Sequence, residues 1–101
     1  MNFDKLKPKI VNIIKSKLSL HKYRIFLFGS RINGTGSERS DIDIGIEAKE
    51  KIEVTKIDEI KEALEKIPTL KKFDVIDFKD VGDDFRKVAL KKIEVLYDRK
   101  I

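Results

Sequence analysis

The hydrophobic residues of the chain recur with two different spacings, which separates expected helices from expected strands. Leucine and isoleucine at helical spacing predict three helices, over residues 3–20, 55–67 and 82–93. Short apolar or alternating runs predict four strands, over residues 24–28, 41–46, 73–78 and 94–97. The order helix–strand–strand–helix–strand–helix–strand is typical of an α/β fold, and the length of 101 residues predicts a single domain over residues 1–101.

The ends of the expected helices carry sequence signals. Pro8 suits a first helical turn, so the first regular helix is expected to begin close to it. Thr55 is predicted to be the N-cap of the second helix, with Asp58 three residues later as in a capping box. Four apolar residues are expected to face inward from the third helix: Phe85, Val88, Ala89 and Ile93.

The expected strands should form one sheet. The strands at 24–28 and 41–46 are joined by only a dozen residues, so they should pair as antiparallel neighbours. The helices should then cover the sheet from one side. The sequence therefore predicts an α/β fold with a mixed β-sheet of about four strands and helices packed mainly on one face.

The expected strand at 41–46 places isoleucines on one face and Asp41, Asp43 and Gly45 on the other. Two carboxylates roughly 6–7 Å apart on one strand face repel by about 2–3 kcal/mol at an effective dielectric near 20, so a cation is expected between them. Gly45 is interpreted as leaving space beside the two carboxylates. The plain alternative is an edge strand whose aspartates simply face water.

Gly29 and Ser30 follow the buried strand at 24–28. A glycine there lets backbone N–H groups approach an anion closely, and the serine hydroxyl is suited to binding a phosphate oxygen. If the two strands pair, this phosphate cradle lies beside Asp41 and Asp43. Such a geometry suits a nucleoside triphosphate with two Mg²⁺ ions, because Mg²⁺ prefers a few carboxylates together with substrate phosphates.

Two Mg²⁺ ions require a third carboxylate, and the strand at 73–78 offers two. Asp74 shares a face with Ile76 and Phe78, whereas Asp77 shares the opposite face, so alternation alone does not choose between them. Asp74 lies deeper in the apolar run, where an unpaired charge is least tolerable without a cation, and this favours Asp74. Asp77 is the alternative, as the polar end of the strand.

Charge and composition limit which partners and which kinds of catalytic chemistry are expected of the chain. The net charge of +5 favours acidic partners such as nucleotides, but the basic residues are scattered and no aromatics interleave with them, so direct nucleic-acid binding is not expected. Cysteine is absent, which excludes disulfides, thiolate metal sites and thiol catalysis. No apolar stretch approaches 18 residues, so the protein is expected to be cytoplasmic, without a membrane partner. Arg39 is either a phosphate or substrate contact or a solvent-exposed loop residue.

The segment Phe28-Gly29-Ser30-Arg31, together with Asp41-Ile42-Asp43, resembles the Gly-Ser-x10-Asp-x-Asp signature of the DNA polymerase beta-like nucleotidyltransferase superfamily. The surrounding sequence is similar to its minimal nucleotidyltransferase (MNT or MntA-like) branch. The segment Phe73-Asp74-Val75-Ile76 is similar to the strand that carries the family's third metal aspartate.

The resemblance implies the nucleotidyltransferase fold and an enzyme of the protein adenylyltransferase kind, which moves AMP from ATP to a hydroxyl with two Mg²⁺ ions. Members of this branch resemble antitoxins that modify a tyrosine of a partner HEPN-type toxin. By resemblance, the triphosphate would be held by Gly29 and Ser30 with help from Arg31, and the metal by Asp41, Asp43 and Asp74. The alternative is a non-catalytic antitoxin that neutralises its toxin by complex formation.

Overall fold

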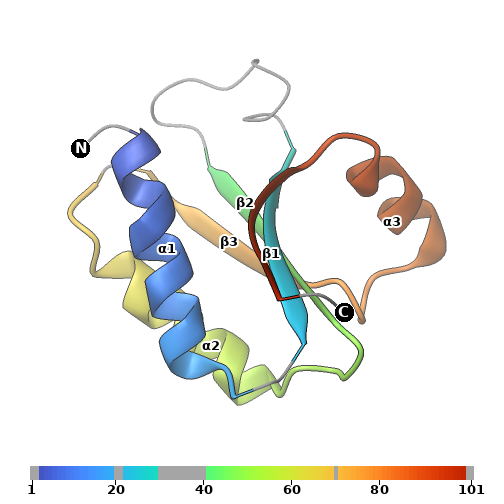
Figure 1. Ribbon diagram of the computed structural model, residues 1–101, viewed down its shortest axis with the longest axis horizontal. Helices are drawn as coiled ribbons and strands as arrows, with labels where there is room; N and C mark the ends of the chain where they lie inside the picture. Colours follow the sequence, from blue (N-terminus) through green and yellow to red (C-terminus); the bar gives the residue numbers. More distant parts are fainter. Residues whose placement is uncertain (1–2, 20–21, 30–40, 70, 100–101) are drawn as a thin grey trace.

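A four-stranded mixed sheet forms the centre of the computed structural model, which describes residues 3–19, 22–29, 41–69 and 71–99 (Figure 1). In chain order the elements are α1 (Phe3–Lys17), β1 (Tyr23–Phe28), β2 (Ile42–Ala48), α2 (Val54–Glu65), β3 (Phe73–Asp77), α3 (Asp83–Leu90) and β4 (Glu94–Arg99). This order is the predicted one. The strands lie in the order β3-β2-β1-β4, so the two strands of the Gly-Ser and Asp-x-Asp segments are central.

The pairing of the strands brings the ends that carry the candidate residues together. β1 pairs antiparallel with both β2 and β4, and β2 pairs in parallel with β3 through the crossover of α2. The antiparallel pairing of the first two strands is therefore confirmed. In this register Asp43 lies opposite Phe28 on one side and Asp74 on the other. The start of β2, the end of β1 and the start of β3 consequently lie side by side at the same end of the sheet.

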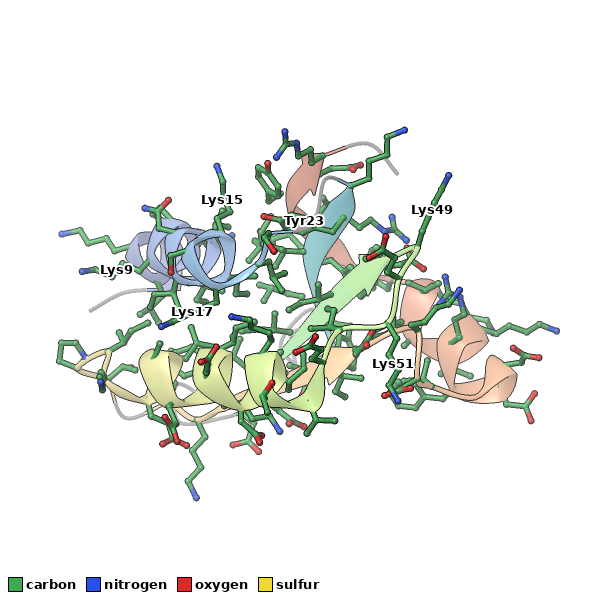
Figure 2. All side chains as sticks on the ribbon, turned by 90° about the horizontal axis from the view of Figure 1, so that it is seen from below. Lys9, Lys15, Lys17, Tyr23, Lys49 and Lys51 are labelled. Atoms are coloured by element: carbon green, nitrogen blue, oxygen red, sulfur yellow. The ribbon has the colours of Figure 1, made fainter. Side chains whose placement is uncertain are left out.

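Two separate cores cover the two faces of the sheet. The larger core lies under α1 and α2 and consists mainly of aliphatic residues, among them Leu6, Ile10, Ile14, Ile25, Leu27, Ile42, Ile44, Ile46, Ile60 and Leu64. On the opposite face Phe26, Phe28 and Phe78 form an aromatic cluster against Ala89 and Leu90 of α3. Figure 2 shows α1 and α2 together on one side of the strands and α3 on the other. Two of the three described helices thus share a face, as the prediction of helices mainly on one face requires.

The starts of α1 and α2 differ from their predictions. α1 begins at Phe3 and runs through Pro8, so the expectation of a start near Pro8 is wrong. Leu6 is fully buried, and its packing fixes the first turn ahead of the proline. α2 has Glu53 as its N-cap without a side-chain hydrogen bond, so Thr55 lies within the first turn and the expected capping box is wrong.

The inward face predicted for the third helix is correct only in part. Ala89, and Ile93 just beyond the end of α3, pack against the aromatic cluster. Phe85 contacts Phe28 and Phe78 with its ring but remains 45% exposed, and Val88, at 68% exposed, does not face inward. The helix has only eight residues, and Arg86 holds it to the sheet through polar contacts with Glu47 and with the carbonyl of Phe78. Because polar contacts supply part of the attachment, the apolar face of α3 is not forced inward.

Positive charge is spread over several elements rather than gathered in one patch. Figure 2 shows Lys9 and Lys15 extending outward from α1, and Lys49 and Lys51 extending from the turn after β2. None of the helices in the described ranges combines the length and the apolar character needed to cross a membrane.

Candidate functional site

Asp43 and Asp74 are direct neighbours on adjacent strands. They pair in the parallel register of β2 and β3, whose backbones lie roughly 4.8 Å apart, and they project from the same face of the sheet. Asp41 precedes β2 on the same strand face and is exposed. Burial raises the pKa of the Asp43 carboxyl, and the negative charges of Asp74 and Asp41 raise that pKa further. The structure therefore brings the three predicted carboxylates into one electrostatic cluster.

The cluster has the oxygen ligands that Mg²⁺ prefers, but it is not a preassembled metal cage. Within the described ranges, no three His, Cys, Asp or Glu side chains stand close enough to hold an ion by themselves. Mg²⁺ usually binds one or two carboxylates and completes its octahedron with water and substrate phosphates. Lys61 approaches Asp74 at 3.9 Å, but both side chains are about half exposed, so this ion pair offsets little of the repulsion. The donor set fits Mg²⁺ that arrives with a phosphate.

Gly29 packs directly against the Asp43 carboxylate. Its φ of +85° lies in the left-handed region, and a Cβ at this position would lie 2.3 Å from Oδ2 of Asp43. Both the backbone conformation and the contact therefore require glycine. The predicted adjacency of the glycine and the carboxylates is present, whereas Ser30, Arg31 and Arg39 lie outside the described residues.

The two aspartates of β3 have different surroundings. Asp77 is 7% exposed, and its carboxylate accepts hydrogen bonds from the backbone N–H groups of Ile52 (2.8 Å) and Lys79 (3.0 Å). It thereby fastens the segment before α2 to the end of β3. Asp74 is exposed on the opposite face, beside Asp43. Of the two, only Asp74 stands beside Asp43, where a third carboxylate of the cluster is needed. The expectation that Asp74 lies deeper than Asp77 is wrong, because Asp77 is the buried aspartate and Asp74 the exposed one.

The space expected beside the carboxylates at Gly45 is filled. A Cβ on Gly45 would lie 2.4 Å from Cε2 of Phe26 and 2.7 Å from Cε1 of Phe78. The rings of these two phenylalanines pack edge to face, with centroids 4.7 Å apart, against the bare backbone of β2. The interpretation of Gly45 as open space is therefore wrong, because the glycine admits two aromatic side chains to the core.

One charged group of this face escaped the sequence analysis. Glu47 continues the alternation of Asp43 and Gly45 along β2 and is 6% exposed. Its carboxylate accepts a 2.7 Å hydrogen bond from Nε of Arg24 and a second hydrogen bond from Arg86, which also donates to the carbonyl of Phe78 at 2.8 Å. The usable signal was the position of an acidic residue inside a buried strand, where a cationic partner is required. The bridge fixes α3 relative to the strands of the site.

The fold and the carboxylate cluster together define a nucleotidyltransferase, and comparison with known proteins agrees. Residues 8–101 match the family model described as polymerase beta, nucleotidyltransferase. The chain belongs to the polymerase beta nucleotidyltransferase family, which confirms the resemblance and the prediction of a transferase. A curated relative from Haemophilus influenzae, the probable protein adenylyltransferase MntA, is 28% identical over 97 residues, which cover 94% of this chain and 85% of the relative.

Solved structures share the same fold. A crystal structure of a toxin–antitoxin with AMP-PNP superposes with a TM-score of 0.77 at 22% identity, over 91% of this chain and 73% of the other. A structure of the tri-AMPylated HEPN toxin of Shewanella oneidensis in complex with its MNT antitoxin gives a TM-score of 0.74 at 18% identity, over 94% of this chain and 71% of the other. The predicted α/β nucleotidyltransferase fold is confirmed.

Proposed function

We propose that the chain transfers AMP from ATP to a hydroxyl of a HEPN-type toxin, most simply a tyrosine, and thereby acts as an antitoxin. The observation that carries the proposal is the contact of the Gly29 backbone with the carboxylate of Asp43, in register with Asp74. It joins a backbone that can approach a phosphate with a cluster of carboxylates whose repulsion the exposed Lys61–Asp74 pair offsets only a little. The curated MntA relative and the toxin–antitoxin structures support the choice of donor and acceptor.

In the proposed reaction the acceptor hydroxyl attacks the α-phosphorus of ATP. A new oxygen–phosphorus bond forms, the bond to the β-phosphate breaks, pyrophosphate leaves, and the hydroxyl proton is released. Asp41, Asp43 and Asp74 would hold two Mg²⁺ ions, which supply charge for the attacking hydroxyl and the leaving pyrophosphate when bound. We assign the triphosphate to Gly29 and Ser30, with Arg31 assisting.

We further propose that residues 1–101 act as one minimal catalytic domain that depends on its partner to present the hydroxyl. The family match extends over residues 8–101, and both cores are built on the same sheet. No separate substrate-holding element is needed if the toxin supplies its own acceptor residue.

The experiment is label transfer from α-³²P ATP to the co-expressed HEPN partner in the presence of Mg²⁺. Asp43→Asn and Asp74→Asn should abolish transfer. Asp80→Asn is the matched control, because Asp80 is an exposed aspartate beyond the end of β3 that pairs only with Lys51 among the described residues, and it should transfer normally. If wild type transfers no label while wild type and Asp43→Asn silence the toxin equally, the chain is a non-catalytic binder and the proposal is wrong.

A further inference from the structure

A cavity of about 490 Å³ opens between α3 and the end of β1. Its sheet side is formed by Phe28, Gly29 and Asp43, and its helix side includes Phe85 and Val88, with Lys91 and Lys92 directly after α3. The volume lies within the range of small-molecule sites. Because Gly29 and Asp43 line it, this cavity is continuous with the carboxylate cluster, although Asp74 is not part of its wall.

The apolar wall of the cavity is unusually exposed for so small a domain. Phe85 and Val88 lie one helical turn apart, and both are more exposed than a core-facing helix position would be. The Phe85 ring contacts Phe28 at a centroid distance of 6.1 Å and Phe78 at 6.0 Å. One side of the Phe85 ring is thus supported by the aromatic cluster, and the remainder is available to a ligand.

The lining of the same cavity also carries positive charge, from Lys91 and Lys92. The ion pairs of the described part of the chain include neither Lys91 nor Lys92. A ligand that complements this lining therefore combines a flat apolar ring with several negative charges. A nucleoside triphosphate has both features, whereas the side chain of an acceptor residue has no need of two lysines.

We propose that this cavity is the nucleoside pocket of the enzyme, in which the base stacks on Phe85 and packs against Val88 while Lys91 and Lys92 bind phosphate oxygens. The proposal rests on the proposed function, since it requires a nucleotide at Gly29 and Asp43. It adds the residues that recognise the nucleoside, on an element outside the Gly-Ser and Asp-x-Asp segments. The side of Asp43 that faces Asp74 is left to the acceptor hydroxyl.

The proposal also implies a preference among bases. A base with a larger ring system stacks more strongly on an aromatic side chain, and the strength of stacking depends little on the hydrogen-bonding groups of the base. ATP and GTP should therefore bind more tightly than CTP and UTP, with a smaller difference between the two purines than between purines and pyrimidines.

The test compares the binding of ATP with that of inorganic tripolyphosphate, both with Mg²⁺, by calorimetry. Phe85→Ala should weaken ATP binding about tenfold and leave tripolyphosphate binding unchanged, because only ATP carries a base. Replacement of both Lys91 and Lys92 by Gln should weaken both ligands. Val54→Ala is the matched control, since Val54 is 64% exposed at the start of α2, away from the cavity, and it should change neither.

Two further variants separate a lost contact from a damaged fold. Phe85→Tyr keeps the ring and should bind ATP as wild type does, whereas Phe85→Leu keeps an apolar side chain without the aromatic face and should bind ATP as weakly as Phe85→Ala. Equal ATP affinity of the Phe85→Ala variant and wild type would overturn the proposal. An unchanged ATP affinity combined with a lost association with the toxin would show that Phe85 docks the partner, which also overturns it.

The failure of this pocket and the failure of the proposed function are distinguishable. If ATP binding depends on Phe85 but no AMP is transferred to any HEPN partner, the proposed pocket is supported and the proposed reaction is wrong. If the Phe85→Ala variant transfers AMP normally with an unchanged KM for ATP, the proposed reaction is supported and the proposed pocket is wrong.

Discussion

Replacement of Gly29 by Ala perturbs the contact on which the site is built. The left-handed backbone at Gly29 costs an alanine roughly 1–2 kcal/mol. The new Cβ would also lie 2.3 Å from Oδ2 of Asp43, so the carboxylate must leave its present rotamer, at a further cost of about 1 kcal/mol. Gly29→Ala should therefore destabilise the fold by about 2–3 kcal/mol and lower its melting temperature by roughly 10–20 °C.

Thermal and urea unfolding followed by circular dichroism measure this change. Gly82→Ala is the matched control, because Gly82 has a φ of −70° and nothing within 4 Å of the position of a Cβ. Its stability should change by less than about 1 kcal/mol, since lost freedom of the unfolded chain offsets a poorer N-cap.

A double-mutant cycle isolates the contact itself. In an Asp43→Ala background the nearest remaining atom of residue 43 is its Cβ at 3.5 Å, an ordinary contact distance, so Gly29→Ala should cost only the backbone part. The coupling energy should be about 1 kcal/mol. A coupling of zero within error would show that Gly29 and Asp43 do not interact as described, and so would a Gly29→Ala variant as stable as Gly82→Ala.

Three other substitutions test neighbouring parts of the site. Burial and neighbouring carboxylates raise the pKa of Asp43, so ionisation of this group destabilises the fold as the pH rises through that pKa. Asp43→Asn should therefore raise the free energy of unfolding by about 1 kcal/mol near neutral pH in metal-free buffer. This gain should vanish below the ordinary aspartate pKa of 3.8, and melting temperatures measured across this pH range test it. Arg86→Ala leaves the buried Glu47 with Arg24 as its remaining cation and should lower the free energy of unfolding in urea by about 2–3 kcal/mol. The control Lys87→Ala, at an exposed position on the same helix, should lower it by less than about 0.5 kcal/mol, and equal losses would contradict the bridge. Gly45→Ala forces two aromatic rings out of place and should cost about 1–3 kcal/mol, and a neutral result by the same assay would contradict the packing described.

Much of the fold follows from local patterns. Strict alternation over 41–46 fixed which side of β2 faces the aliphatic core, and the short connection between the first two strands required an antiparallel pair. The contact between Gly29 and Asp43 follows from these two facts, because the end of one strand then meets the start of the other. This part of the site was accessible from the sequence.

The remainder depends on tertiary contacts that a single sequence does not display. Alternation could not choose between Asp74 and Asp77, because that choice depends on which face of β3 lies against α2 and on the register of β3 with β2. Thr55 looks like an N-cap, yet the N-cap of α2 is Glu53, two residues earlier, next to Ile52, whose N–H donates to the carboxylate of Asp77. Phe85 follows a core-like pattern but lies beside a cavity, and only the packing of α3 decides this.

The proposed transfer of AMP to a HEPN-type toxin depends on the carboxylates of Asp43 and Asp74. The most direct measurement is the intact mass of the co-expressed HEPN toxin after incubation with the chain, ATP and Mg²⁺. We expect adenylyl increments on the toxin with wild type, none with Asp43→Asn or Asp74→Asn, and none for wild type in EDTA until Mg²⁺ is restored. A toxin of unchanged mass whose activity is nevertheless silenced by wild type would contradict the claim.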